Sequence, residues 1–271
     1  MPELPEVESI VRCLSSNIKP PQILKVIVLR ADILVNTSQE HLCKHLPGQV
    51  MQKIYRRGKY IVMKFSNGGH LVTHLRMSGL YRFLNGNETV PYLRLWFELE
   101  GDKKLGYADK RALGRIWLYL PGEPLSVLTK LGPEPLAADF TLERFQQSVH
   151  WRHSPIKPLL LNQTFVAGIG NIYASEILYQ AGISPSHYAS DLTSEEVYKI
   201  YRAIRSILEQ AIACRGTHIS DFADPEGNEG EFVNRLKVYQ KAGDICPRCG
   251  GIIQRTVQQQ RSTYWCPGCQ H

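Results

Sequence analysis

Residues 246–269 are CPRCGGIIQRTVQQQRSTYWCPGC, in which Cys246-Pro-Arg-Cys249 and Cys266-Pro-Gly-Cys269 are separated by 16 residues. Each C-x2-C pair can present two thiolates to one tetrahedral ion, and the spacer accommodates a β-hairpin. Because four sulfur ligands close the coordination sphere, we expect one structural Zn²⁺ ion with no open position for catalysis. The alternative is a pair of redox motifs, but a thioredoxin-type site needs a strand-to-helix setting that this stretch lacks.

The segment that surrounds the cysteines is cationic. Between residues 234 and 271, six Lys and Arg side chains stand against one Asp. Arg261 lies near the tip of the predicted hairpin, with Tyr264 and Trp265 just behind it. A cation on a rigid, metal-clamped hairpin is well placed to enter a DNA groove. The alternative is an ordinary solvated surface arginine.

The composition of the whole chain indicates a globular protein with an anionic partner. The 271 residues suggest two or three domains, and the net charge of +7 favours nucleic acid. No apolar run approaches the ~18 residues that a membrane span needs. The start MPELPEVES lacks the basic and apolar parts of a secretory signal, so we expect a cytosolic protein. In that compartment the scattered cysteines, Cys13, Cys43 and Cys214, are expected to be buried free thiols.

The first region is predicted to open with a helix and continue as strands. Val7, Ile10, Val11 and Leu14 follow the i, i+3, i+4, i+7 pattern of a helix with one apolar face. Glycine, asparagine and aspartate separate the strand-like runs that follow, which favours an antiparallel meander folded as a sandwich. These runs are Lys53–Phe65, Leu71–Phe83, Arg94–Leu99 and Arg115–Leu120.

The second region begins near the turn LGPEPL (131–136) and is predicted to be helical. Thr193 and Glu196 have the spacing of a capping box, and a further helix is expected to begin near Asn171, after the glycine-rich AGIGN. The polar, glycine-rich segment 216–230 is expected to be a mobile loop.

The N-terminus of the chain could supply a reactive amine. Removal of the initiator methionine would leave Pro2 with a free secondary amine, whose pKa near ~8 lies well below that of lysine. The N-terminus of the predicted helix, and Lys59 if it lies nearby, would lower that pKa further. Such an amine attacking a sugar C1′ gives an iminium with a fixed positive charge, which promotes elimination of a 3′-phosphate. Glu3 could transfer protons beside it, and Glu6 could orient the site or simply favour the helix dipole.

Taken alone, Pro2 and Glu3 are more typical of an ordinary helix start than of a catalytic pair, but further motifs accompany them. In chain order these motifs are MPELPEVE (1–8), RRGKY (56–60), HLRMSG (74–79), LGPEP (131–135), GIGNIYASE (168–176) and YWCPGC (264–269). The ordered set closely resembles the formamidopyrimidine-DNA glycosylase family. Each motif is modest by itself, but together they are specific and cover essentially the whole chain.

The resemblance implies an α+β multidomain fold. Its parts would be an N-terminal β-sandwich with flanking helices (1–130), a helix–two-turns–helix domain with a lesion-capping loop (131–230) and a zinc finger with a β-hairpin (231–271), with DNA in the cleft between them. It implies a bifunctional base excision repair enzyme that removes 8-oxoguanine and formamidopyrimidines and nicks the strand by β,δ-elimination. The expected partner is damaged double-stranded DNA, bound by a monomer in the bacterial cytosol or nucleoid.

The resemblance also implies roles for individual residues. Pro2 would be the Schiff-base nucleophile, Glu3 the general acid/base, and Lys59 an active-site residue near the lesion and its phosphate. Arg261, which completes the expected catalytic set, matches a phosphate-contacting residue on the finger. The further expected contacts with the DNA backbone are Lys157, Asn171 and Tyr239.

Two segments depart from the family pattern. Met77 and Arg111 match residues that fill the space left by a flipped nucleotide, but the usual D-x-R-x-F-G is DKRALG here, so that Leu113 replaces phenylalanine. Leucine is still an apolar wedge but has no flat face for stacking, which leaves the opposite-base discrimination open. The His-x-His element found before the family's central strand is replaced by residues 90–92, Val-Pro-Tyr.

By the same resemblance, loop 216–230 corresponds to the family's lesion-capping loop. The alternative is a connector without that role.

Two other functions remain open at this point. An endonuclease VIII-like glycosylase for oxidised pyrimidines would suit the ending YWCPGCQH equally well, although PELPEVE and the Met77/Arg111 pair resemble the purine branch. A non-catalytic zinc-ribbon protein that only binds DNA is the second alternative. Intact Pro2, Glu3 and Lys59 argue against it, because a protein that only binds has no need of an N-terminal amine.

Overall fold

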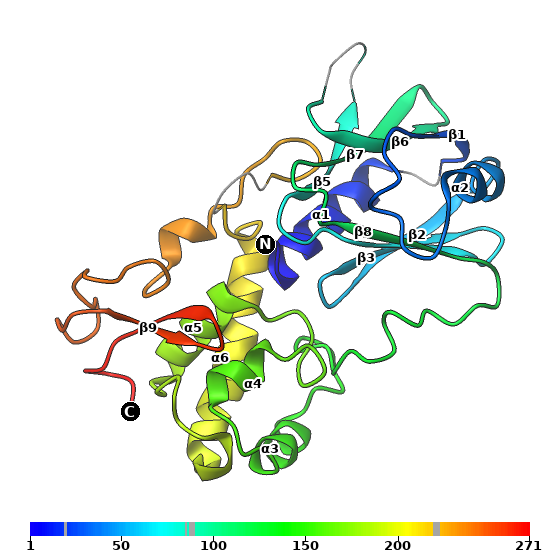
Figure 1. The fold of residues 1–271 in the computed structure, drawn as a ribbon. Coiled ribbons are helices and arrows are strands. Elements are labelled where there is room, and N and C mark those ends of the chain that lie inside the picture. The colour runs from blue at the N-terminus through cyan, green and yellow to red at the C-terminus, as the bar shows by residue number, and fades with distance from the viewer. Residues whose placement is uncertain (19–20, 85, 87–89, 219–222) are drawn as a thin grey trace. The chain divides into compact units, whose positions relative to one another are not determined.

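The structure is a computed structural model that describes residues 1–18, 21–84, 86, 90–218 and 223–271 (Figure 1). The chain divides into two compact units, each described by itself below. The first unit comprises Met1–Thr129 and Arg215–Glu231, and the second comprises Lys130–Cys214 and Phe232–His271. Among the described residues, no helix is both long and apolar enough to span a membrane.

The first unit contains two antiparallel sheets and two helices in its described part. The sheets have the strand orders β1-β6-β7-β5 and β2-β3-β4-β8. The elements are α1 (Leu4–Asn17), β1 (Ile23–Val28), α2 (Gln39–His45), β2 (Met51–Arg57), β3 (Tyr60–Phe65), β4 (His70–His74), β5 (Gly79–Leu84), β6 (Leu93–Leu99), β7 (Lys103–Asp109) and β8 (Arg115–Tyr119).

The two sheets share one hydrophobic core, which makes this unit the predicted sandwich. Ile61 and Met63 of β3 belong to the same buried cluster as Leu95 and Phe97 of β6. Alternate residues of each strand point into this cluster, as expected where two sheets pack face to face. The predicted apolar stripe of α1 is confirmed, since its four residues from Val7 to Leu14 are buried in the same core.

Two predicted strand runs are each divided into two strands. Lys53–Phe65 is the hairpin β2–β3, which turns at Gly58 and Lys59; Gly58 has a φ of +56°, a conformation that glycine adopts without strain. Leu71–Phe83 begins as β4 in one sheet and continues as β5 in the other. The crossing falls in the HLRMSG motif, where Arg76 has a φ of +55°. Strands β1 and β7 lie outside the runs predicted from sequence.

The second unit is built from helices and one hairpin in its described part. Its elements are α3 (Leu142–His150), α4 (Ile156–Leu161), α5 (Asn171–Ala181), η1 (Ala189–Asp191), α6 (Ser194–Ala213), η2 (Phe232–Arg235), β9 (Gln254–Gln258) and β10 (Arg261–Trp265). The predicted start of α5 at Asn171 is confirmed. The capping box of α6 is also confirmed, with the Thr193 and Glu196 side chains each accepting the other's backbone N–H.

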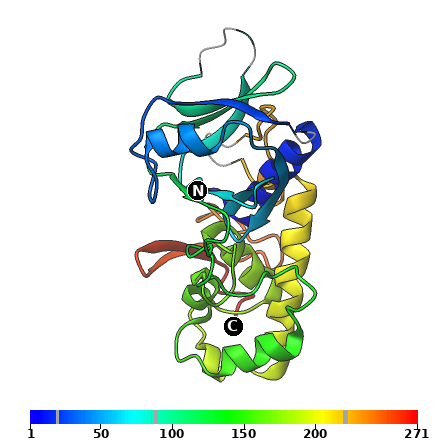
Figure 2. The same cartoon turned by 90° about the vertical axis from the view of Figure 1, so that its right-hand side faces the viewer.

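The hairpin β9–β10 extends away from the helices of this unit in the turned view (Figure 2). Gln258 pairs with Arg261, so the loop is the two residues Gln259 and Gln260, with φ values of +45° and +61°. Two consecutive positive φ values are typical of the type I′ turn, whose twist matches that of the flanking strands.

The segment Arg215–Glu231 belongs to the first unit, although the sequence prediction groups residues 216–230 with the helical domain. Thr217 pairs with Glu231 in an isolated β-bridge, which closes the base of the segment. Further along, the Phe83 N–H of β5 donates to the Pro225 carbonyl (3.1 Å). The predicted mobility of this loop also concerns residues 219–222, which lie outside the described residues.

Candidate active site and nucleic-acid interface

Pro2 is buried and lies two residues before Leu4, the first residue of α1. Glu3 is the N-cap residue of α1 and is 3% exposed. Its backbone N–H donates to the Glu6 Oε2 atom (2.8 Å), which fixes the first turn. The Glu3 side chain is therefore held directly beside the residue that would carry the reactive amine.

Glu6 links this helix start to a distant segment of the same unit. While its Oε2 atom accepts the Glu3 N–H, its Oε1 atom accepts the backbone N–H of Thr217 (2.7 Å). Gly216 lies so close to Glu6 that an added Cβ atom would stand 2.7 Å from the Oε1 atom. The structure therefore gives Glu6 an orienting role, through a contact across 211 residues that local sequence could not reveal.

Lys59 lies in the turn between β2 and β3 and is 5% exposed. It is close enough to His74 to affect its charge: burial, assisted by the cations Arg76 and Lys59, lowers the pKa of His74 to about 3. The neutral ring accepts the Arg76 N–H at Nδ1 (3.0 Å). The sequence prediction missed His74, although it is the first residue of the HLRMSG motif.

Met77, Arg111 and Leu113, which we call the wedge cluster, come from two loops of the first unit. Met77 and Leu113 are 47% and 43% exposed, unusual values for large apolar side chains. The Arg111 Nη1 atom lies 3.4 Å from the Met77 Sδ atom. The structure therefore brings the predicted pair Met77 and Arg111 together and leaves both apolar members accessible.

A buried carboxylate shapes the loop that carries two members of this cluster. Asp109 is fully buried, and its Oδ1 atom accepts the Ser78 hydroxyl (2.6 Å) and the Arg111 N–H (3.2 Å). Its Oδ2 atom accepts the Gly114 N–H (2.7 Å), and Arg94 donates twice to its backbone carbonyl. The sequence prediction did not single out Asp109, although it opens the DKRALG segment.

In the second unit, Lys157 and Asn171 fasten the hairpin to the helices. The Lys157 Nζ atom donates to Asn171 Oδ1 (2.7 Å), Ser262 O (3.0 Å) and Thr263 Oγ1 (2.8 Å). Asn171 also donates to the Ser262 carbonyl (2.9 Å). Lys157 is fully buried, so these contacts give it a positioning role, and its direct contact with DNA stays a prediction. Asn171, the first residue of α5, is half-buried.

Glu176 of the GIGNIYASE motif braces the chain segment that precedes the finger. Its carboxylate, 1% exposed, accepts the backbone N–H groups of Lys237, Val238 and Tyr239 at 2.8 to 2.9 Å. Burial raises the pKa of Glu176, although these three hydrogen bonds oppose the shift. Tyr239 packs edge-on against Tyr264 of β10 (ring centroids 5.2 Å apart), so this brace also positions a predicted DNA contact.

Arg261 is exposed at the first position of β10, directly after the turn, as predicted. It lines an open groove that includes residues of α4 and of the loop before α4. The predicted site residues are thus divided between the units. Pro2, Glu3, Lys59 and the wedge cluster belong to the first unit, and the four predicted phosphate contacts belong to the second.

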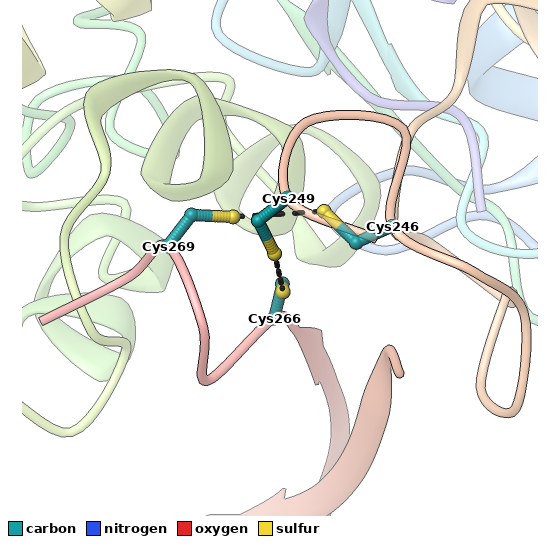
Figure 3. Close-up of side chains that lie close together, drawn as sticks. All are labelled: Cys246, Cys249, Cys266 and Cys269. Carbon is teal, nitrogen blue, oxygen red and sulfur yellow. Dashed lines mark hydrogen bonds between the residues drawn. The ribbon is translucent and has the colours of Figure 1, made fainter. Parts of the chain in front are cut away.

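The four predicted cysteine ligands converge at one point of the second unit (Figure 3). Their Sγ atoms all lie within 4.8 Å of one another, with Cys246–Cys269 at 3.5 Å and Cys249–Cys266 at 3.4 Å. Four sulfur atoms about 2.3 Å from a central zinc ion would be about 3.8 Å apart, so the cluster fits a tetrahedral Zn²⁺ site.

The surroundings favour the thiolate at Cys246, whereas burial raises the pKa of Cys266 and Cys269. Burial opposes ionisation of Cys246, but the Tyr179 hydroxyl (3.4 Å away) and backbone N–H groups outweigh it and lower the pKa of Cys246 to about 6. Arg248 lies over the Tyr179 ring (4.4 Å to its centroid) and adds positive charge. The other three cysteines are free thiols as predicted, although Cys43 is only half-buried.

Three family models match the chain in order. They are the formamidopyrimidine-DNA glycosylase N-terminal domain (residues 1–116), the formamidopyrimidine-DNA glycosylase H2TH domain (131–223) and a zinc finger found in FPG and IleRS (243–271). A formamidopyrimidine-DNA glycosylase from Pelotomaculum thermopropionicum is 40% identical over 274 residues, with 100% of this chain and 99% of the relative covered. The chain belongs to the formamidopyrimidine-DNA glycosylase family.

Solved structures of this family have the same fold. The complex of a Lactococcus lactis FPG variant with DNA that contains Fapy-dG has a TM-score of 0.93 at 35% identity, and all of both chains is covered. MutM bound to DNA that contains carbocyclic 8-oxo-G has a TM-score of 0.92 at 36% identity, again over the full length of both chains. These likenesses confirm the predicted α+β fold of sandwich, helical domain and zinc finger.

The first departure from the family pattern is Leu113 in place of phenylalanine. Its side chain is 43% exposed, so the loop that carries it can accept a larger residue. The second departure, Val90-Pro91-Tyr92, immediately precedes β6. Tyr92 has a φ of +60°, and its carbonyl accepts the Asp109 N–H (3.0 Å). Nothing in the structure explains why this segment replaces the family's His-x-His element.

Proposed function

We propose that this member of the formamidopyrimidine-DNA glycosylase family is a bifunctional DNA glycosylase and AP lyase. Its substrates would be oxidised purines in double-stranded DNA, above all 8-oxoguanine and formamidopyrimidines. The observation that carries the proposal is Pro2, which lies at the start of α1 directly before the buried carboxylate of Glu3.

The chemistry follows from a secondary amine beside a proton carrier. The Pro2 nitrogen attacks C1′ of the damaged nucleoside as the bond from C1′ to the base breaks, and the amine proton passes to the departing base. Glu3 then protonates O4′ as the C1′–O4′ bond breaks, which opens the sugar ring and leaves an iminium at C1′. The resulting iminium has no nitrogen-bound proton to lose, so it keeps its positive charge. That charge accepts electrons when a proton leaves C2′ and the 3′-phosphate is expelled, and a second elimination then releases the 5′-phosphate.

The rest of the first unit prepares the nucleotide for this attack. Lys59, 5% exposed and close to His74, would hold a phosphate near the lesion. An enzyme that reacts at the sugar of a stacked nucleotide must swing that nucleotide out of the duplex. Met77, Arg111 and Leu113 would then fill the space left in the stack, which the exposure of both apolar members supports.

The second unit would hold the DNA backbone. Arg261 presents its guanidinium at the hairpin tip, and Asn171 and Tyr239 stand on segments that Lys157 and Glu176 fix in place. Phosphate contacts of this kind set the register of a protein on DNA without reading its sequence. The four-cysteine site, as a closed coordination sphere, supplies the rigidity of the finger and takes no part in the reaction.

Borohydride trapping tests the proposal. With protein from which Met1 has been removed, reduction should give a covalent complex with DNA containing 8-oxoguanine opposite cytosine. Retention of an additional N-terminal residue should abolish the adduct, because the proline nitrogen would then be part of an amide. Glu3→Gln should reduce trapping at least about 100-fold, the scale of general acid–base catalysis.

The matched control is Glu195→Gln, which makes the same change on an exposed residue of α6 and should leave trapping unchanged. The proposal fails if trimmed wild-type protein gives no adduct, or if blocking the amine leaves the adduct intact. The first of these results would also favour the non-catalytic DNA-binding alternative.

The competing activity, excision of oxidised pyrimidines, is tested with the same assay on thymine glycol and 5-hydroxycytosine. We expect rates on these lesions to be lower than on 8-oxoguanine and formamidopyrimidine. A faster reaction on the pyrimidines would assign the chain to that specificity.

We also propose that the protein acts as a monomer in the bacterial cytosol, associated with the nucleoid. The bacterial source of the relatives supports the location. Sedimentation of the free protein and of its complex with one lesion duplex would test the monomer, and cell fractionation would test the location.

A further inference from the structure

An open groove of about 590 Å³ lies on the second unit beside Arg261. This volume is in the range of small-molecule sites. The segment after α3, helix α4 and the hairpin all contribute to its lining. The lining residues include Trp151, Arg152, His153, Leu159, Gln259 and Arg261.

Trp151 gives the groove an aromatic surface in contact with water. Its side chain is 84% exposed, the highest value for a large apolar residue in the described part of the chain. Tryptophan is rarely this accessible in a protein without a partner, because its ring has a large apolar area. The exposed indole therefore indicates a surface that a flat ligand covers.

The charge of the groove selects an anion. Arg152 and Arg261 contribute two guanidinium groups and His153 an imidazole, and none of the lining residues is acidic. Within the described residues, neither Arg152 nor His153 forms a side-chain hydrogen bond or an ion pair. Guanidinium groups that are free of carboxylates are well suited to phosphate.

Both sides of the groove are held in place by contacts that do not use the side chains of Arg152 and His153. On the α3 side, the Arg152 N–H donates to Val149 O (3.0 Å) and the Ala189 N–H to Ser154 O (2.9 Å). On the hairpin side, Lys157 of α4 donates to Ser262 and Thr263. An aromatic ring and cations at fixed positions form a site that needs little ordering when a ligand binds.

We propose that this groove binds single-stranded DNA, with an unpaired base stacked on Trp151 and its phosphate held by Arg152 and Arg261. An aromatic ring next to cations is the general arrangement by which proteins bind single strands. A base within a duplex is unsuitable, because neighbouring bases already cover both of its faces. The inference rests on the proposed function, since it adds an unpaired segment to the DNA that such an enzyme would hold.

Fluorescence anisotropy with a labelled ten-nucleotide oligothymidylate tests this site. Trp151→Ala should weaken binding of this single strand about tenfold or more, the scale of one lost base–aromatic stack. Trp151→Phe should keep most of the affinity but lose the change in protein fluorescence on binding, because Trp151 is the one tryptophan among the residues that line the groove. Tyr198→Ala, which removes another exposed aromatic ring (44% exposed), is the matched control and should bind like wild type.

The same variants are then compared on a blunt duplex that contains 8-oxoguanine, where Trp151→Ala should leave binding and borohydride trapping unchanged. Unaltered oligothymidylate affinity in Trp151→Ala overturns the inference, and so does an equal loss of affinity for the blunt duplex. The failure of the proposed function is a different result: wild-type protein that binds oligothymidylate through Trp151 but gives no adduct with the lesion.

Discussion

At the scale of single residues, buried charged and polar groups determine how the first unit presents its site. Asp109 is the clearest case, because both of its carboxylate oxygens accept hydrogen bonds from the segments that carry the wedge cluster. A buried acceptor of this kind is costly to disturb, because its donors lose their partners with no water to replace it.

Asp109→Asn should therefore weaken both stability and lesion excision. The amide nitrogen would face an N–H or O–H donor, and the loss in unfolding free energy should be about 1–3 kcal/mol. Excision of 8-oxoguanine should slow about tenfold or more, while nicking at a preformed abasic site changes less, because no damaged base has to be displaced. Single-turnover assays on the two substrates measure the difference. Asp102→Asn, in an exposed turn, should change neither.

His74 makes the stability of the first unit depend on pH. The folded protein keeps this residue neutral, with a pKa of about 3 against an ordinary value of 6.5. Below pH 6.5 the unfolded chain therefore binds a proton that the folded chain does not, and stability should fall by up to ~1.4 kcal/mol per pH unit towards pH 3. Urea unfolding at pH 7.5 and pH 5.0 should show a smaller decrease for His74→Asn than for wild type. An equal decrease in both proteins would contradict the role of His74, and the exposed His150→Asn serves as control.

Leu113 is the residue at which specificity can be changed. Its exposed side chain leaves room for phenylalanine, which would restore a flat face to the wedge cluster. We expect Leu113→Phe to increase the ratio of excision opposite cytosine to excision opposite adenine by several-fold, about 1 kcal/mol of added stacking. Paired duplexes that differ only in the opposite base measure this ratio. An unchanged ratio would show that Leu113 does not limit discrimination.

At the scale of elements, the zinc finger depends on its ion more than on its own small core. Its buried cluster comprises little more than Tyr179, Val238, Ile253 and the metal ligands. A segment of this size cannot stabilise a fold by apolar burial alone, so metal binding has to supply the folding free energy.

Cys249→Ser should remove the zinc ion and reduce affinity for a lesion duplex at least about tenfold, because Arg261 would lose its rigid support. The first unit should keep its fold, since its core is separate. Zinc content by native mass spectrometry and duplex affinity measure the two effects. Cys43→Ser, the same change at a half-buried thiol of the first unit, should retain one zinc ion per chain. Equal zinc content in both variants would contradict the assigned ligands.

At the scale of the whole molecule, the net charge of +7 predicts that DNA binding depends strongly on salt. Each phosphate contact adds about 0.9 to the slope of log affinity against log salt concentration. Arg261→Gln should therefore reduce this slope by about 1, equally on damaged and undamaged duplexes. Arg12→Gln is the control, because that exposed arginine on α1 already pairs with Glu8 and should leave the slope unchanged. An unaltered slope in Arg261→Gln would exclude a phosphate contact by this residue.

Local sequence alone determined several parts of this protein. The cysteine spacing determined the zinc site, because two thiolates three residues apart can reach the same ion wherever the rest of the chain lies. The apolar period of α1 and the capping box at Thr193 predicted helices α1 and α6 correctly. Both signals are local, because they depend on residues within one or two helical turns. Pro2 and Glu3 were recognisable because they are adjacent in sequence.

Only the tertiary structure decided the features that join distant segments. The hydrogen bond from Thr217 to Glu6, the brace from Glu176 to residues 237–239 and the burial of Lys157 under the hairpin leave no periodic or spacing signal. Tertiary packing likewise assigned Arg215–Glu231 to the first unit and divided the predicted run Leu71–Phe83 between the two sheets. The physical reason is that a buried polar group needs hydrogen-bond partners, and the folded chain can supply them from segments that are far apart in the sequence.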